Sequence, residues 1–185
     1  MRTIPGMTVM NPADEAEAAA ALEAALALDG PVYIRFGRYA VPDVTSAHPF
    51  AVGKGQMLKD GADVTIAATG FMTHLALEAA NLLENEGVSA AVANFGTIKP
   101  LDTPLLVGCA IKTGAIVACE EHTTIGGFGA AICETLAESF PVPVLRVGVE
   151  DRFGQSGPVP ALLEEYNLTA KHIADMAKKA IGLKG

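Results

Sequence analysis

Two acidic residues and a histidine, Glu120-Glu121-His122, stand between an apolar stretch and a glycine-rich turn. The apolar stretch, residues 116–119, is typical of a buried strand, and the turn leads into an expected helix at residues 127–140. In open α/β sheets, ligands bind just beyond the carboxyl ends of such strands. His122 could act there as a general acid or base oriented by a carboxylate, or it could be a hydrogen-bonded structural residue.

The turn itself contains Gly126, Gly127 and Gly129. Its spacing fails the G-x-G-x-x-G dinucleotide fingerprint, because Ile132 stands at the third glycine position, and the chain has no GK[ST] phosphate loop. A helix amino end can still bind an anion through its free N–H groups and the helix dipole. Together with His122, these glycines therefore indicate either an anion or interface site, or a close approach of the helix to the sheet.

A second group of candidates, Arg35 and Arg38, lies at and just after an expected strand at residues 32–36. Guanidinium groups bind phosphate oxygens in a bidentate manner, so the pair could clamp a phosphate; the alternative is a solvated strand end. A polar, glycine-rich loop at residues 151–157 could be functional or a simple turn. No histidines or cysteines stand at metal-ligand spacing, so we expect no metal site.

The elements that would position these residues begin with a helix, in which Asn11 is expected to be the cap and Pro12 the first residue. The residues of its expected apolar face are Ala18, Leu22, Ala25 and Leu26. The strand at residues 32–36 follows. Because no strand is expected before this helix and strand, they indicate the tail of a domain whose earlier part lies elsewhere.

An irregular segment at residues 37–49 is expected to be a linker, after which strands and helices alternate. The expected strands are residues 52–57, 64–68, 88–94, 116–119 and 143–149, and the expected helices are residues 73–86, 103–112, 127–140, 158–166 and 169–181. Gly87 is expected to end the first of these helices in a left-handed conformation, and Asp102 to cap the second. The alternation predicts an α/β fold with three αβα layers and a mostly parallel sheet of about five strands.

The composition excludes several classes of function. Half of the 185 residues are hydrophobic and 18% are charged, which is enough to bury a sizeable core. The net charge of −8 argues against nucleic acid and anionic membranes as partners. We expect no signal peptide and no membrane span, and three free cysteines (Cys109, Cys119 and Cys133) fit a reducing, cytoplasmic location.

Five stretches together resemble the carboxyl-terminal part of the transketolase family of thiamine-diphosphate enzymes. They are IPGMTVMNPADEAEA (residues 4–18), VYIRFGR (32–38), TIKPLD (97–102), VACEEHTTIGGFGAA (117–131) and RVGVEDRFGQSG (146–157). The chain is most similar to the split transketolases, which are made as amino- and carboxyl-terminal subunits. The resemblance implies that residues 1–50 are the tail of a pyrimidine-binding module plus a linker, and that residues 51–185 are the transketolase C-terminal domain.

The resemblance also implies an activity, the transfer of a two-carbon ketol unit between sugar phosphates within a larger assembly. Arg38 matches the position that holds the substrate phosphate in this family, whereas Arg35 does not carry that role. The family's activating glutamate and its GDG-type motif have no match here. We therefore expect no catalytic residue in this chain, which alone would be inactive. Thiamine diphosphate and a divalent metal are expected in the full assembly, with neither bound to this chain alone.

The expected partners are an amino-terminal transketolase subunit or missing segment, a second copy in a homodimer, and a sugar phosphate. One alternative is the carboxyl-terminal part of a 1-deoxyxylulose-5-phosphate synthase or of a 2-oxoacid dehydrogenase E1 beta subunit. The other is a non-catalytic assembly module that binds a regulatory anion at His122 and residues 126–129. The Arg-Phe-Gly-Arg run favours a sugar-phosphate enzyme, and residues 146–157 favour transketolase over the synthase.

Overall fold

The computed structural model describes all residues from 1 to 185 and contains two sheets. The larger sheet has the order β3-β5-β4-β7-β8. Its strands are β3 (Gln56–Lys59), β4 (Val64–Ala68), β5 (Ala90–Asn94), β7 (Ile116–Thr123) and β8 (Val144–Val149). The last four are parallel to one another, and β3 joins the edge antiparallel to β5. The prediction of a mostly parallel sheet of about five strands is confirmed.

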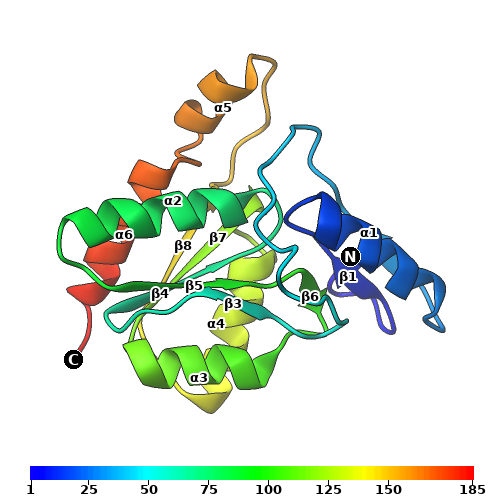
Figure 1. Cartoon of the computed structure of the whole chain (residues 1–185), viewed down its shortest axis with the longest axis horizontal. Helices are drawn as coiled ribbons and strands as arrows, with labels where there is room; N and C mark the ends of the chain where they lie inside the picture. Colours follow the sequence, from blue (N-terminus) through cyan, green and yellow to red (C-terminus); the bar gives the residue numbers. More distant parts are fainter.

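Two pairs of helices cover this sheet, one pair on each face (Figure 1). The first pair is α2 (Met72–Asn85) and α6 (Ala170–Ile181), and the second pair is α3 (Thr103–Thr113) and α4 (Phe128–Ser139). Successive residues of a strand point to opposite faces, so β7 sends Val117 to the first core and Ala118 to the second. The three αβα layers are therefore as predicted.

Local sequence signals place the helix boundaries in this domain. The Asp102 side chain accepts a hydrogen bond from the backbone N–H of Leu105 and caps α3. Gly87 follows α2 with φ +79°, the left-handed conformation that glycine adopts without strain. Both predictions are confirmed, and β4 has the predicted bounds. The strand expected at residues 52–57 begins later, at Gln56.

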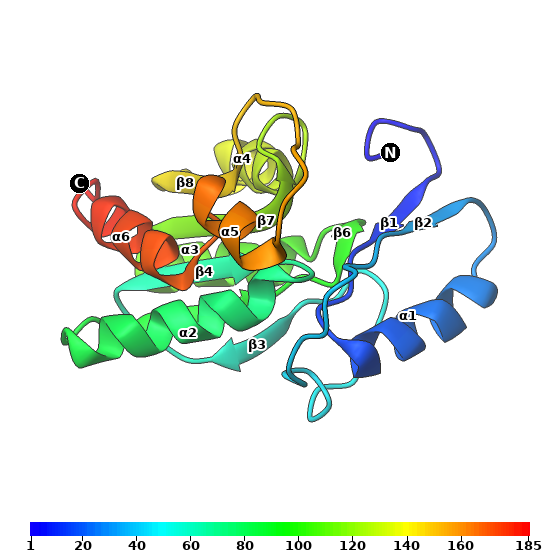
Figure 2. The ribbon, with the colours of Figure 1, turned by 90° about the horizontal axis from the view of Figure 1, so that it is seen from above.

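The smaller sheet corrects the prediction that no strand precedes the first helix. Its strands are β1 (Thr8–Met10), β2 (Val32–Ile34) and β6 (Thr97–Lys99), in the order β2-β1-β6. β1 is the parallel partner of β2, whereas β6 runs antiparallel to β1. β6 lies between β5 and α3 in the chain, so a strand from the larger unit completes the sheet of the amino-terminal unit, which lies at one end of the molecule (Figure 2).

The first helix, α1 (Glu15–Leu26), differs from the prediction in its cap and in its buried face. Asp14, not Asn11, caps it, because the Asp14 side chain accepts a hydrogen bond from the Glu17 N–H, while the Asn11 N–H bonds the Gly96 carbonyl. Its buried residues are Glu17 and Ala21, and the predicted face residues Leu22 and Leu26 are 52% and 83% exposed. Two residues of the predicted apolar face, Leu22 and Leu26, are thus exposed, whereas Ala18 and Ala25 are partly buried.

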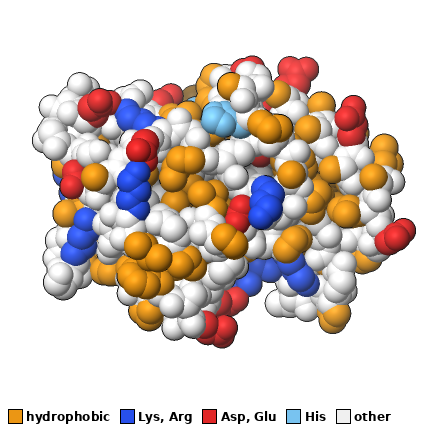
Figure 3. Space-filling view, turned by 60° about the horizontal axis from the view of Figure 1, so that its bottom comes forward, with side chains coloured by type: hydrophobic (Ala, Val, Ile, Leu, Met, Phe, Trp, Pro, Cys, Tyr) orange, Lys and Arg blue, Asp and Glu red, His pale blue; other side chains and the backbone are white.

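The remaining segments form the surface. Residues 37–49 contain no helix or strand, as predicted for a linker. The short helix α5 (Val159–Glu165) has no buried residue and projects from the body beside the loop that precedes it (Figure 1). On the face shown in Figure 3, acidic and basic side chains are interspersed and no continuous basic strip crosses it. No helix is both long and apolar enough to span a bilayer.

Candidate functional site

The candidate site begins at the carboxyl end of β7, which extends through the acidic residues and the histidine instead of ending at Cys119. Strand alternation separates the two acids. Glu120 turns toward α4 and is 2% exposed, whereas Glu121 turns to the opposite face and lines a cavity. Glu120 therefore lies against α4, whereas its neighbour Glu121 lines a cavity on the other face of the sheet.

Glu120 caps the amino end of α4. Its carboxylate accepts hydrogen bonds from the backbone N–H groups of Phe128 (2.7 Å) and Gly129 (2.8 Å). A Cβ at Gly127 would lie 2.1 Å from Glu120 Oε2, and a Cβ at Gly129 would lie 2.9 Å from Arg146 Cγ. Gly127 therefore admits the carboxylate to the helix end, and Gly129 leaves room for the Arg146 side chain. The Phe128 and Gly129 N–H groups, which an external anion would need, already donate to Glu120, so they are not available to an anion at residues 126–129.

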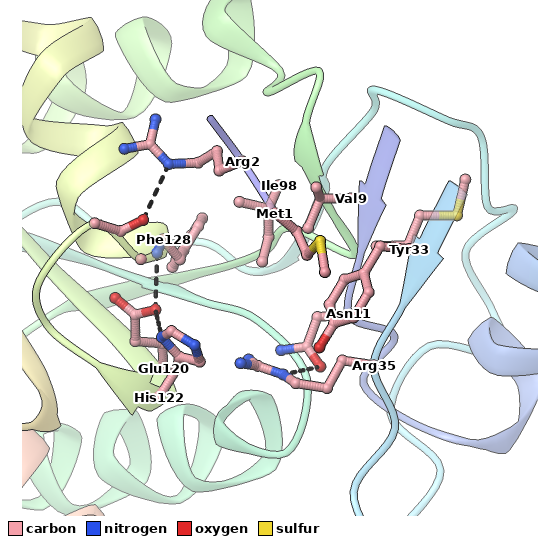
Figure 4. A pocket seen from close by; sticks show the side chains of 13 residues that line it. Met1, Arg2, Val9, Asn11, Tyr33, Arg35, Ile98, Glu120, His122 and Phe128 are labelled. Atoms are coloured by element: carbon pink, nitrogen blue, oxygen red, sulfur yellow. Dashed lines mark hydrogen bonds and ion pairs between the residues drawn. The ribbon is translucent and has the colours of Figure 1, made fainter. Parts of the chain in front are cut away.

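His122 lies at the rim of a small cavity of about 90 Å³ between the two units. Its side chain is 46% exposed, and Nδ1 lies 3.2 Å from the carbonyl oxygen of Thr123 and 3.9 Å from Glu120 Oε2. Arg35 extends from β2 toward the side of the cavity where Glu120 and His122 lie (Figure 4). The histidine is thus available to a partner or ligand at this junction.

Arg35 is held in place by Asn11. With the Asn11 amide oriented to satisfy its neighbours, its oxygen accepts a hydrogen bond from Arg35 Nη2 (2.9 Å) and its nitrogen donates to the Arg35 carbonyl (3.1 Å). Asn11 is itself fixed, because its N–H donates to the Gly96 carbonyl (2.9 Å) and its carbonyl accepts from Thr69 Oγ1 (3.2 Å). The guanidinium of Arg35 is thereby positioned from the carboxyl edge of the larger sheet.

A second, larger cavity of about 370 Å³ lies on the other side of Arg35 and brings the candidates from both units together. Its charged lining residues are Arg35, Arg38 and Glu121, and none of them belongs to an ion pair within 4 Å. Although Glu121 is exposed overall, desolvation of its carboxyl at the cavity wall raises its pKa, and the charge of Arg35 opposes this rise. The sequence suggested that Arg35 and Arg38 act together, but not that Glu121 faces them.

A buried polar network also joins the two units. Glu17 of α1 is 2% exposed and accepts hydrogen bonds from the Ala13 N–H (2.7 Å) and from Asn94 Nδ2 (2.8 Å). Asn94, at the end of β5, also accepts from Thr73 Oγ1 and donates to Gln56. Burial raises the pKa of Glu17, while these hydrogen bonds lower it. Sequence reasoning missed Glu17, although an acid between alanines near a helix start was a visible signal.

The chain's donor groups do not form a metal site. No three His, Cys, Asp or Glu side chains lie together in a way that could hold a metal ion. Cys109 and Cys119 are buried free thiols, and burial raises the pKa of both. The residues present therefore do not fit the divalent metal that accompanies thiamine diphosphate.

Two family models match the chain. The model for the transketolase C-terminal domain matches residues 53–173, and the model for the transketolase pyrimidine-binding domain matches residues 1–43. The first match covers more than half of the chain.

Individual relatives agree with these matches. A 6-deoxy-6-sulfo-D-fructose transketolase subunit from Clostridium sp. (strain MSTE9) is 47% identical over 96% of this chain and 55% of its own length. A 1-deoxy-D-xylulose-5-phosphate synthase from Heliobacterium modesticaldum is 43% identical over 97% of this chain and 28% of its own length. This chain thus spans about half of the first relative and less of the second.

The fold also matches solved structures. A structure described as a split-gene transketolase, inactive beta4 tetramer, is 49% identical with a TM-score of 0.96, and the match covers all of this chain and 61% of the other. A transketolase mutant from Pichia stipitis, in complex with fructose-6-phosphate, is 25% identical with a TM-score of 0.77, covering 98% of this chain and 26% of the other.

Proposed function

The chain belongs to the transketolase family, and on that premise we propose that it forms the carboxyl-terminal part of a thiamine-diphosphate-dependent transketolase. The assembly would transfer a two-carbon ketol unit between sugar phosphates. When bound by other parts of the assembly, thiamine diphosphate supplies the carbanion chemistry. This chain contributes substrate binding and a C-terminal domain.

The observation that carries this proposal is the cavity that Arg38 lines at the junction of the two units. Arg38 is exposed and has no carboxylate partner, so its guanidinium is free to bind a phosphate with two parallel hydrogen bonds. A solvated strand end would need no such cavity. We infer that Arg38 binds the phosphate of the sugar substrate.

We further infer that residues 1–50 are the tail of the pyrimidine-binding module plus its linker, and that residues 51–185 are the C-terminal domain. The two family-model matches, which leave residues 44–52 between them, support this division. The exposed Leu22 and Leu26 of α1 support a neighbour that covers this face. The proposed partners are an amino-terminal subunit or segment and a second copy of this chain.

A second candidate function is the carboxyl-terminal part of a 1-deoxyxylulose-5-phosphate synthase, because one such synthase is 43% identical. A third is an assembly or regulatory module in which the exposed His122 and the turn at residues 126–129 form an interface. The product of the reconstituted reaction separates the first two, since the synthase releases carbon dioxide from pyruvate and the transketolase does not.

Reconstitution tests the proposal. The chain is mixed with the amino-terminal subunit of a split transketolase, any missing pyrimidine-module segment, thiamine diphosphate and Mg²⁺, and ketol transfer between sugar phosphates is followed. We expect transfer only when all components are present. If a complete mixture forms a complex and transfers no ketol unit from any sugar phosphate or sugar sulfonate donor, the proposal is wrong.

A further inference from the structure

The cavity that contains Arg38 has an unusual charge balance for a phosphate site. Its lining includes two guanidinium groups, Arg35 and Arg38, and one carboxylate, Glu121. With all three ionised, the cavity carries one positive charge in excess. The carboxylate comes from the C-terminal domain, whereas both arginines come from the amino-terminal unit. A carboxylate near an anion-binding arginine repels the anion. Glu121 should therefore weaken the binding of any anion in this cavity.

We propose that Glu121 is a specificity-determining residue that sets the preference between singly and doubly charged end groups on the sugar substrate. This inference takes the identity of the substrate from the proposed function. The binding of an anion in this cavity can be tested without it. A sulfonate carries one negative charge and would neutralise the cavity. A phosphate dianion would leave one negative charge uncompensated.

Geometry separates this role from that of the neighbouring acid. Glu120 is buried and both of its oxygens bond the α4 backbone, so it is committed to the fold. Glu121 forms no ion pair and faces Arg35 across the cavity, close enough for their charges to interact. Glu121 is exposed overall, so water screens its charge in part and its effect on a bound anion should be moderate. One acid of the motif is structural and the other faces the ligand space.

The fixed position of Arg35 also supports a role for Glu121 in specificity. Asn11 fixes its guanidinium, which forms the wall between the two cavities. It therefore contributes a fixed positive charge opposite Glu121, and Arg38 contributes the exposed guanidinium that reaches the ligand. Among the relatives, one is named for a sugar sulfonate, 6-deoxy-6-sulfo-D-fructose, and another for apulose-4-phosphate, so both kinds of end group occur on the substrates named for this family.

The test uses the full chain with two small probes, inorganic phosphate and methanesulfonate, titrated by calorimetry or NMR at about pH 8, where phosphate is mostly doubly charged. The variants are Glu121→Gln, which keeps the shape and removes the charge, and Glu138→Gln, an exposed acid on α4, as the matched control. Arg38→Met shows whether the probe binds at this cavity, and thermal unfolding confirms that each variant is folded.

We expect Glu121→Gln to tighten methanesulfonate binding about threefold and phosphate binding about tenfold, because a dianion interacts twice as strongly with the removed charge. Arg38→Met should weaken both probes, and Glu138→Gln should change neither. An unchanged ratio of the two affinities in Glu121→Gln, or no binding of either probe to the wild-type chain, would overturn the proposal. Ketol transfer is measured separately. If the assembly is active but Glu121→Gln does not change the ratio of the phosphate and methanesulfonate affinities, only the role of Glu121 is refuted.

Discussion

The amino-terminal unit, residues 1–50, and the larger unit, residues 51–185, are stabilised in different ways. The larger unit has a core on each face of its sheet, and α2 alone buries seven residues. In the amino-terminal unit, α1 buries only Glu17 and Ala21. The larger unit is therefore held mainly by its own apolar packing. The amino-terminal unit depends on contacts with its neighbour, which are polar at Asn11 and Glu17 and apolar at Val9.

This difference explains where the candidate site lies. The amino-terminal unit docks on the carboxyl edge of the larger sheet through Asn11, Glu17 and the pairing of β1 with β6. The cavities with Arg35, Arg38 and Glu121 are formed where the two units meet. Polar groups serve this junction well, because hydrogen bonds fix the direction of a side chain more closely than apolar contacts do.

The largest effect should come from breaking the core of the larger unit. Leu83 of α2 is fully buried and its neighbour Leu82 is 43% exposed. We expect Leu83→Ala to cost about 2–5 kcal/mol in the free energy of unfolding and Leu82→Ala less than about 1 kcal/mol. Denaturant unfolding followed by circular dichroism measures both. Equal losses in the two variants would contradict the assigned core.

The next largest effect should come from releasing the amino-terminal unit. Glu17→Ala leaves the Ala13 N–H without its acceptor and leaves Asn94 Nδ2 with only its longer hydrogen bond to Gln56. The expected cost is about 1–3 kcal/mol for the buried group left unpaired. Hydrogen exchange should accelerate in residues 8–34, while β4 and β7 stay protected. The exposed Glu23→Ala is the control and should change exchange little. If hydrogen exchange accelerated equally in both units, Glu17 would not stabilise the amino-terminal unit selectively.

A smaller effect should appear on acidification, through Asp14. Burial favours its neutral form, but hydrogen bonds from the Glu17 N–H and from Thr45 outweigh this and hold the pKa of Asp14 below its usual value. Its contribution is thus complete above the usual Asp pKa of about 3.9 and is lost as the pH falls through the lower, folded value.

The corresponding variant is Asp14→Asn, which has no charge to lose. Between about pH 5 and pH 2, the stability of the wild-type chain should fall more steeply than that of this variant. Thermal unfolding at a series of pH values measures both slopes. Parallel slopes would mean that the ionisation of Asp14 does not strengthen its hydrogen bonds with Val44 and Thr45.

The same comparison shows what the sequence could predict. In the larger unit, apolar runs and turn residues such as Gly87 and Asp102 act locally, so strands and helix ends were predicted nearly in place. In the amino-terminal unit, β1 has three residues and gains its order from pairing with β6, nearly 90 residues later. The apolar pattern of α1 predicted burial of Leu22 and Leu26, which are exposed in this chain.

For the site, the residue types were visible but their convergence was not. Arg35, Arg38 and His122 were predicted as candidates, whereas Glu17 was missed and the position of Glu121 was unknown. Strand alternation after Cys119 could have placed Glu120 and Glu121 on opposite faces. Nothing in local spacing could show that Glu121 faces Arg35, because the two lie 86 positions apart and meet only through the docking of the two units.

The substrate role of Arg38 is the central claim, and the Michaelis constant of the reconstituted enzyme tests it most directly. The measurement compares wild type with Arg38→Met for a phosphorylated acceptor and for an unphosphorylated one such as glycolaldehyde. We expect KM for the phosphorylated acceptor to rise at least about tenfold, as the loss of a charge-assisted bidentate contact implies, with little change for glycolaldehyde and for cofactor affinity. An unchanged KM for the phosphorylated acceptor would contradict the account.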